Sequence, residues 1–305
     1  MPIRLVVPDD AEAVVSLINA YDVTSFATAR ALRSVLERDD PPGTVRLVAE
    51  SGGEIVGFAR CRLAADRTGW CWVGVRPEHR RRGLGSELYG RLERALRSQD
   101  AADARATVSG AEAGPFAIRH GFEQERVMRL QALDLTTADL PRPPVETVSL
   151  AQAGVESIRE LYLATLADVP FPTPREILDD DFRRQVADSE ILDLEASRVV
   201  LEDGEPVAFT VVIANAESGR AGSQMTGVRR DRRGRGLAHA VKAASASRAR
   251  ERGLRLLVTA NDLDNEPMLA VNRKLGFEPS ILVEEYRKEL REETASGRAP
   301  RAPAR

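Results

Sequence analysis

Two short basic loops carry the residues with the clearest chemical potential in this 305-residue chain. Their shared pattern is R-x-x-G-x-G/A, carried by Arg80, Gly83 and Gly85 in the first loop and by Arg233, Gly236 and Ala238 in the second. Glycine lets a backbone approach a ligand closely, and a helix that begins at such a loop offers free N–H groups and the positive end of its dipole. Both features favour binding of a pyrophosphate, and the arginines would add positive charge at its rim.

The two loops belong to a repeat that runs through the chain. Residues 75–85 match 228–238, and two further landmarks keep the same order and nearly the same spacing: 53–58 match 204–209, and 121–123 match 276–278. A single basic loop could be a solvated run of charge, but recurrence in the same context favours a ligand-binding role. The chain is therefore predicted to contain two copies of one fold.

The elements that must position each loop follow from the spacing of apolar residues. In the first half we expect strands at 3–7, 45–50, 55–63, 70–75 and 105–109, helices after residue 8, over 84–96 and before Gly121, and a closing strand at 126–135. In the second half we expect helices over 155–168, 237–252 and 266–275, and strands at 198–201, 206–214, 224–228, 254–259 and 281–290. This order predicts a mixed α/β (α+β) architecture.

Composition sets the domain boundaries. Residues 136–147 hold three prolines and few apolar side chains, which favours an extended linker. We expect an N-terminal domain over 1–135 and a C-terminal domain over 148–290. The last stretch, 291–305, lacks periodicity and is predicted to be a disordered tail.

Charge and cysteine content exclude several function classes. The net charge of −3 gives no global attraction to nucleic acid or to an anionic membrane. Two cysteines and three histidines without ligand spacing argue against a metal site. The N-terminus does not read as a signal peptide, and no apolar run is long enough to span a bilayer. We expect a cytoplasmic protein, monomeric or homodimeric, without nucleic-acid or membrane partners.

Each loop follows a strand and is followed by a Gly-Phe pair, Gly121-Phe122 in the first half and Gly276-Phe277 in the second. In these features the chain resembles the GNAT acetyltransferase superfamily. Its tandem arrangement is similar to that of mycothiol synthase, and the resemblance runs from Ile3 to about Leu290. It implies two GNAT-type domains, each a mixed, mostly antiparallel sheet flanked by helices. It also implies acetyl-CoA as cosubstrate, with no metal.

The resemblance implies two possible cofactor sites, with the pyrophosphate on the loop amides and pantetheine beside the preceding strand. The first would comprise Val73, Gly74, Val75, Arg80, Arg81, Arg82, Gly83, Leu84, Gly85 and Ser86. The second would comprise Thr226, Gly227, Val228, Arg233, Gly234, Arg235, Gly236, Leu237, Ala238, His239 and Asn265. His239 could lie beside a phosphate or be only a solvated helix position.

The two halves differ in the remaining family features, an Asn after the fifth strand and a Tyr four residues before the Gly of Gly-Phe. The first half has no such Asn and carries Ala117 at the Tyr position, and Gly114-Pro115 should break its short helix. The second half has Asn261 and Asn265, with Asn272 at the Tyr position. Asn272 and Asn265 are therefore the catalytic candidates, although Asn265 could be merely a helix N-cap.

We expect the second half to be catalytic and the first to be either a degenerate copy or a second CoA site. The expected reaction is acetyl transfer to a primary amine of a small molecule or peptide, with an oxyanion held by a backbone N–H near Val228. The general base is not identified; the candidates are Asp262, Asp264, Glu266 and the acids at 179–181. Tyr21 and Tyr162 are candidates for the acceptor pocket. The alternative is a non-catalytic acyl-CoA-binding or sensing protein, which loss of the Tyr in both halves would favour.

Overall fold

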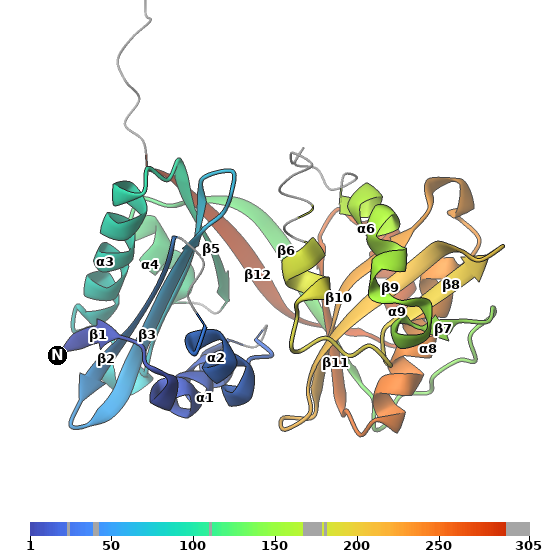
Figure 1. Ribbon diagram of the computed structural model, residues 1–305, viewed down its shortest axis with the longest axis horizontal. Helices are drawn as coiled ribbons and strands as arrows, with labels where there is room; N and C mark the ends of the chain where they lie inside the picture. The colour runs from blue at the N-terminus through green and yellow to red at the C-terminus, as the bar shows by residue number, and fades with distance from the viewer. Residues whose placement is uncertain (23–24, 39–42, 110–111, 167–178, 180–181, 291–305) are drawn as a thin grey trace, which may run out of the picture.

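A single twelve-stranded sheet runs through both halves of the chain. The computed structural model describes residues 1–22, 25–38, 43–109, 112–166, 179 and 182–290. The strand order is β1-β2-β3-β4-β5-β12-β6-β11-β10-β9-β8-β7. Two neighbouring pairs, β4–β5 and β10–β11, are parallel, and the others are antiparallel. The predicted mixed, mostly antiparallel sheet flanked by helices is confirmed (Figure 1).

The first half follows the predicted order, except for one added helix, α2, which the sequence did not predict. Its elements are β1 (Ile3–Leu5), α1 (Ala11–Tyr21), α2 (Ala29–Leu36), β2 (Thr44–Ser51), β3 (Glu54–Leu63), β4 (Thr68–Val75), α3 (Leu84–Ser98), β5 (Asp103–Ser109), α4 (Ala113–Arg119) and β6 (Glu123–Asp134). The expectation that Gly114-Pro115 would break the short helix was wrong. Both residues lie in the first turn of α4, where backbone N–H groups have no helical partner to lose.

The second half repeats this plan. Its elements are β7 (Val148–Ser149), α5 (Leu150–Ala153), α6 (Arg159–Leu166), β8 (Arg198–Glu202), β9 (Glu205–Asn215), β10 (Arg220–Val228), α8 (Leu237–Glu251), β11 (Leu256–Asp262), α9 (Glu266–Lys274) and β12 (Glu278–Glu289). The sequence did not predict β7 and α5, which are too short to show a periodicity. The expected tail, 291–305, lies outside the described residues.

The last strand of each half is exchanged between the halves. We expected 126–135 to close the first half, but β6 pairs with β11 and β12, and β12 pairs with β5 and β6. In Figure 1 the two strands cross side by side between the halves. β6 and β12 occupy equivalent positions in the repeat. Their local sequence patterns therefore do not predict which of them pairs with β5 and which with β11. The exchange places β6 beside the second copy of the loop.

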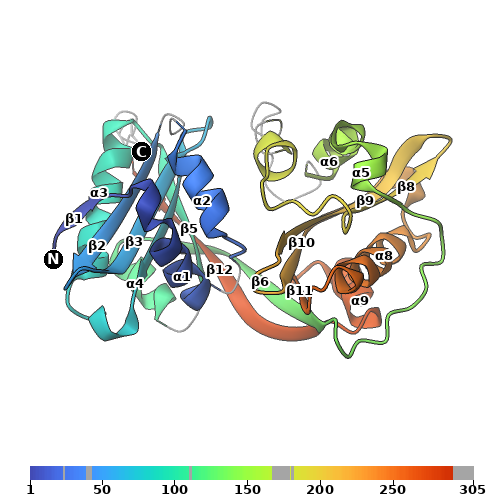
Figure 2. The ribbon, with the colours of Figure 1, turned by 60° about the horizontal axis from the view of Figure 1, so that its bottom comes forward.

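The helices cover the sheet on both faces. In the first half α3 buries Leu88, Leu92 and Leu96 against one face, and in the second half α8 buries Ala243, Ala246 and Ala249 against its sheet. Figure 2 shows α1 and α2 on the side of the first half that faces the second, with α3 on its outer side. The small side chains of α8 let that helix lie close to β9 and β10, at the base of the second loop.

Candidate active site

Both loops lie at the junction of a strand and a helix, as predicted. Each contains a short 3₁₀ turn, Pro77–His79 or Arg230–Arg232, and ends at a glycine that precedes the helix. The glycines Gly83 and Gly236 have φ of 83° and 75°, a left-handed conformation that favours glycine. Among the described residues no side chain caps either helix. The first N–H groups of α3 and α8 are thus suited to accept an anion.

The repeated arginine, Arg80 or Arg233, hydrogen-bonds to the backbone where its own loop begins, as well as adding positive charge there. Arg80 Nε donates to the backbone oxygen of Val75 at 2.9 Å, and Arg233 Nε donates to that of Val228 at 3.2 Å. In both halves the side chain therefore ties the loop to the last residue of the preceding strand. This contact explains why arginine recurs at this position of the repeat.

In the second half, strands β10 and β11 separate to form a slot. They pair only from Arg220–Leu256 to Gly222–Val258 and then diverge. Beyond Gly222, the edge of β10 facing β11 has no strand partner among the described residues. The backbone oxygen of Ser223 accepts from Thr259 Oγ1, and the backbone groups after Ser223 are available to a ligand. A β-bulge between Ser223 and Met225 interrupts the pairing of β10 with β9. Such a bulge redirects backbone groups, and it lies at the apex of the slot.

The corresponding strand in the first half, β4, pairs with β3 in unbroken register from Gly57–Val75 to Leu63–Gly69. It diverges from β5 after Cys71–Ala106. The bulge thus distinguishes the second copy from the first.

A cavity of about 1240 Å³ fills the slot in the second half. Nine of the predicted cofactor residues line it: Thr226, Val228, Arg233, Gly234, Gly236, Leu237, Ala238, His239 and Asn265. Gly227 and Arg235 do not. A Cβ on Gly227 would lie 2.4 Å from both the Phe209 ring and Thr165 Oγ1, so this glycine is required by packing. The cavity continues along residues 125–128 of β6, the strand contributed by the first half.

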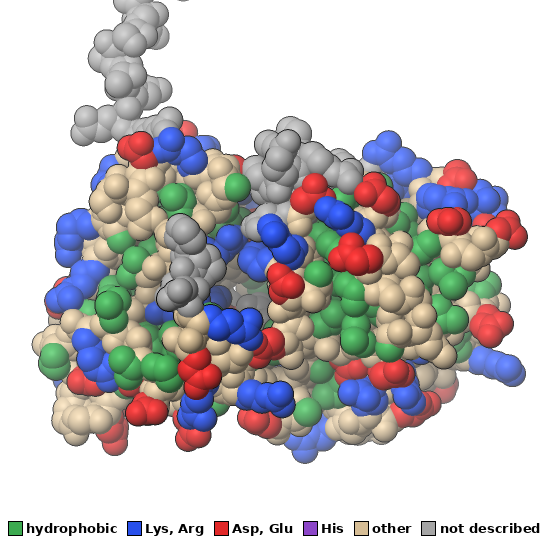
Figure 3. All heavy atoms as spheres, in the orientation of Figure 1, with side chains coloured by type: hydrophobic (Ala, Val, Ile, Leu, Met, Phe, Trp, Pro, Cys, Tyr) green, Lys and Arg blue, Asp and Glu red, His purple; other side chains and the backbone are tan. Residues whose placement is uncertain are grey.

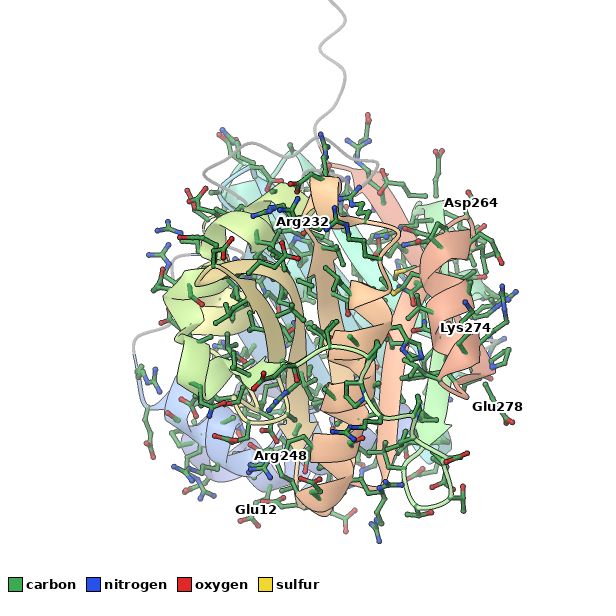
Figure 4. All side chains as sticks on the ribbon, turned by 90° about the vertical axis from the view of Figure 1, so that its right-hand side faces the viewer. Glu12, Arg232, Arg248, Asp264, Lys274 and Glu278 are labelled. Carbon is green, nitrogen blue, oxygen red and sulfur yellow. The ribbon has the colours of Figure 1, made fainter. Side chains whose placement is uncertain are left out.

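The mouth of this cavity lies at one end of the sheet. Figure 4 shows Arg232 and Asp264 at the same end, where α8 and α9 begin. Both residues line the cavity. Figure 3 shows a recess between the two halves with Lys and Arg side chains along its edge. A ligand can therefore approach the phosphate loop from the mouth, while β6 gives the cavity a wall where the halves meet.

In the first half the predicted residues also come together, but Phe116 of α4 and His120 after it pack against the first turn of α3. A Cβ on Gly85 would lie 3.3 Å from the Phe116 ring. That ring lies 4.6 Å from His120, whose Nε2 is 3.0 Å from Ser86 Oγ. On β4, the Trp72 ring lies directly over Gly74. Ser86 and Gly85 thus have protein contacts where the second half has a cavity.

The arginine of the first loop is also engaged. Arg80 Nη1 forms a 2.9 Å ion pair with Glu112, and its guanidinium lies 5.2 Å from the centre of the Tyr21 ring. Tyr21, predicted to line an acceptor pocket, is in contact with this loop instead. Tyr162, the other candidate, is 3% exposed and packs between Phe182 and Phe209 in the core, so that prediction was wrong.

The asparagines of the second half form a network. Asn272 is fully buried and does not line the cavity; its Nδ2 donates to Gln131 Oε1 at 2.9 Å and to Asn261 Oδ1 at 2.8 Å. Asn272 therefore orients Asn261, which does line the cavity. Asn265 caps α9, accepting from the N–H of Met268 at 3.3 Å, and also lines the cavity. Gln131 was missed because it comes from β6, far away in the sequence.

Most carboxylates proposed as the general base are held in ion pairs. Asp262 accepts from Arg126 at 2.6 Å, Glu266 pairs with Arg273 at 2.5 Å, and Asp179 pairs with Arg159 at 3.1 Å. Asp264 lies at the cavity mouth, and positions 180–181 lie outside the described residues. The structure adds Lys242, which sequence reasoning did not single out. It lines the cavity with its Nζ 3.1 Å from Ser223 Oγ.

Metal sites and membrane-spanning helices can be checked in the part of the chain that the structure describes. Across it, no group of three or more His, Cys, Asp or Glu side chains is arranged to hold a metal ion. None of its helices has the length and apolar character needed to cross a membrane.

Comparison with known proteins agrees with the duplicated site. The family model of the Acetyltransferase (GNAT) family matches residues 12–122 and again 156–277. The chain is 26% identical to a mycothiol acetyltransferase of Parafrankia sp. (strain EAN1pec), covering 90% of this chain and 98% of that one. It is 24% identical to a mycothiol acetyltransferase of Actinosynnema mirum, covering 88% and 93%.

Solved structures share the whole fold. A tandem GNAT protein from the clavulanic acid biosynthesis pathway superposes with a TM-score of 0.71 at 23% identity, covering 96% of this chain and 99% of that one. A GCN5-related N-acetyltransferase from Sphaerobacter thermophilus gives 0.68 at 22% identity, covering 95% and 96%. With two matched segments, two strand–loop–helix motifs and one shared sheet, the chain belongs to the GNAT family of acetyltransferases, as a tandem member with two GNAT domains.

Proposed function

We propose that the second half of this chain transfers the acetyl group of acetyl-CoA to a primary amine of a small molecule or peptide. The main support for this proposal is the cavity, which connects the start of α8 at Gly236 with the open edge of β10 and the bulge beside Ser223. This is the arrangement that a pyrophosphate joined to a long amide-containing arm requires. The relatives named mycothiol acetyltransferases favour a small-molecule acceptor.

Each part of the cavity has a role in this proposal. The N–H groups at the start of α8 would hold the pyrophosphate, and the open edge of β10 would bond the amides of the pantetheine arm. Asn261, oriented by Asn272, lies across the slot on β11. A backbone N–H beside the bulge, rather than the one near Val228 expected from the sequence, would hold the oxyanion that forms when the amine attacks the thioester. The acceptor amine would reach the thioester along β6.

We assign the first half a structural role. It supplies β6, and with it Gln131 and a wall of the cavity. In its own site, Phe116 packs against Gly85 and Ser86 is hydrogen-bonded to His120. The units proposed from the repeat, 1–135 and 148–290 joined by 136–147, thus depend on each other through the exchanged strands.

A matched pair of substitutions tests this division of labour. Gly83 and Gly236 occupy the same place in the two loops, both with positive φ and both with open space where a Cβ would be. Glutamate at either position meets the same backbone strain, but it puts a carboxylate where an anion would bind. Gly236→Glu should weaken acetyl-CoA binding at least about 100-fold, equivalent to about 2.7 kcal/mol, whereas Gly83→Glu should leave it unchanged.

The measurement is isothermal titration calorimetry with acetyl-CoA, followed by thiol release on a panel of amino acid esters, amino sugars and aliphatic amines. Binding that survives Gly236→Glu, or that is lost with Gly83→Glu, would contradict the site assignment. Tight binding without thiol release on any amine would favour an acyl-CoA-binding role instead.

A further inference from the structure

Lys242 is a buried amine beneath the cavity of the second half. It lies on α8, six residues after the glycine that begins the helix, and is only 2% exposed. Its Nζ donates to Ser223 Oγ at 3.1 Å and lies 5.2 Å from the centre of the Phe277 ring. It also lines the cavity. Lysine is among the residues that proteins bury least, so this placement calls for a chemical reason.

A chain of hydroxyl groups connects Lys242 with the slot. Ser223 Oγ lies 3.2 Å from Thr210 Oγ1, which lies 2.9 Å from Thr226 Oγ1. Thr226 lines the cavity on the open edge of β10. Thr259 Oγ1 donates to the backbone oxygen of Ser223 at 3.2 Å and holds the apex of the slot closed. Hydroxyls both donate and accept, so such a chain can pass a proton between its ends.

Lys242 has no carboxylate partner among the described residues. The charged groups that face the cavity from the surrounding elements are His239 on α8, Arg232 and Arg233 on the loop, Asp262 on β11, Glu125 and Arg126 on β6, and Asp264 at the mouth. Asp262 is paired with Arg126, and Arg232 with Glu202. Burial is the sole cause that lowers the pKa of Lys242, to about 7. The Phe277 ring opposes this by favouring the ammonium form.

We propose that Lys242 is the proton-accepting group of the acetyl transfer. The inference rests on the proposed catalysis by the second half, and it places a base inside the cavity, where Asp262 is held by Arg126 and Asp264 lies only at the mouth. A base is most effective when its pKa lies near the working pH, and burial is how enzymes bring a lysine into that range.

The proton balance is as follows. Neutral Lys242 takes one proton from the ammonium of the acceptor, directly or through Ser223. The free amine attacks the thioester carbonyl, so a C–N bond forms and the C–S bond breaks. The second proton of the nitrogen goes to the departing CoA thiolate, which leaves as the thiol. Lys242 then releases its proton to solvent, and one proton is produced per acetyl group transferred.

The composition of the chain makes this inference directly measurable. Lys242, Lys274 and Lys288 are its three lysines, so [13Cε]lysine labelling gives three side-chain signals by NMR. Lys274→Arg and Lys288→Arg assign the signals by elimination without disturbing Lys242. We expect the Lys242 signal of the full-length protein to titrate with a midpoint near pH 7. A midpoint above 9 would overturn the proposal.

The pH dependence of the reaction rate gives a second test of the role of Lys242. With the amine that gives the fastest thiol release in the panel above, kcat should fall as pH decreases through about 7. Lys242→Met should lower kcat at pH 7.5 by about 100-fold or more and abolish this acid limb, with little change in acetyl-CoA affinity. Tyr89→Phe, at the corresponding place in the first half, is the matched control and should retain both rate and limb. His239→Asn should retain the limb, which separates Lys242 from the imidazole, since imidazoles titrate in the same range.

The outcomes distinguish this inference from the proposed function. An acid limb that persists in Lys242→Met, with normal acetyl-CoA binding, refutes the role of Lys242 alone. Stoichiometric acetylation of Lys242 itself, seen by mass spectrometry with loss of turnover, also refutes it. Loss of acetyl-CoA binding in Gly83→Glu rather than Gly236→Glu refutes the proposed function. If Lys242→Met does not fold, the NMR midpoint of the unmodified protein still decides.

Discussion

Replacing Lys242 by methionine should change how the stability of this protein depends on pH. The pKa of Lys242 falls from 10.5 to about 7 when the chain folds. Between these values the unfolded chain holds a proton that the folded chain has lost, so the free energy of unfolding rises with pH. Each pKa unit corresponds to about 1.4 kcal/mol. Between pH 7, where the folded lysine is half protonated, and pH 9, the rise from this side chain is about 2 kcal/mol.

Methionine fills the same space without a titrating group. Lys242→Met should therefore be more stable than the unmodified protein at pH 7, and this advantage should shrink by about 2 kcal/mol at pH 9. The assay is urea unfolding of both proteins at 25 °C and pH 7, 8 and 9, followed by two spectroscopic probes. Taking the difference between the two proteins removes the contribution of every other titrating group. Parallel stability curves would refute the conclusion that Lys242 is neutral in the folded protein.

Two further predictions concern the polar network and the N-terminal strand. Asn272→Ala leaves the amide oxygens of buried Gln131 and partly exposed Asn261 without this donor. It should lower the free energy of unfolding by about 2 kcal/mol and weaken acetyl-CoA binding, measured by urea unfolding and calorimetry, and unchanged binding would argue against its positioning role. Arg4 holds the pKa of the Asp10 carboxyl below its usual value through a 2.7 Å ion pair, so its stabilisation is present above pH 4 and is lost as pH falls. Arg4→Met should therefore flatten the acid limb of stability followed by circular dichroism between pH 5 and 2, and an unaltered limb would contradict this.

Local patterns predicted the parts of the site that adjacent residues build. The amphipathic spacing after Leu84 marked α3, because a helix on a sheet must bury one face, and the repeat placed α8 at the corresponding position after Leu237. The glycines at 83 and 236 marked the helix starts, because their φ angles favour glycine. Together these signals located both strand-to-helix loops.

Contacts between distant segments could not be read in the same way. The exchange of β6 and β12 depends on which of two equivalent edges each strand joins, and their repeating pattern is the same for both choices. Gln131 and the cavity wall at 125–128 were missed for this reason. Lys242 was missed because a lysine on a helix is usually solvated, and only the tertiary structure shows that this one faces β10.

The exchanged strands also bear on how the protein forms during synthesis. A growing chain releases β5 from the ribosome well before β12, its partner along Asp103–Glu289 to Ser109–Val283, has been made. At about 5–20 residues per second, one edge of the N-terminal sheet stays unsatisfied for roughly 10 to 35 seconds. During that interval the exposed ladder is a template for pairing with other nascent chains. The N-terminal half therefore reaches its native sheet only after residues 278–289 have been made, and until then the edge at β5 stays exposed to such pairing.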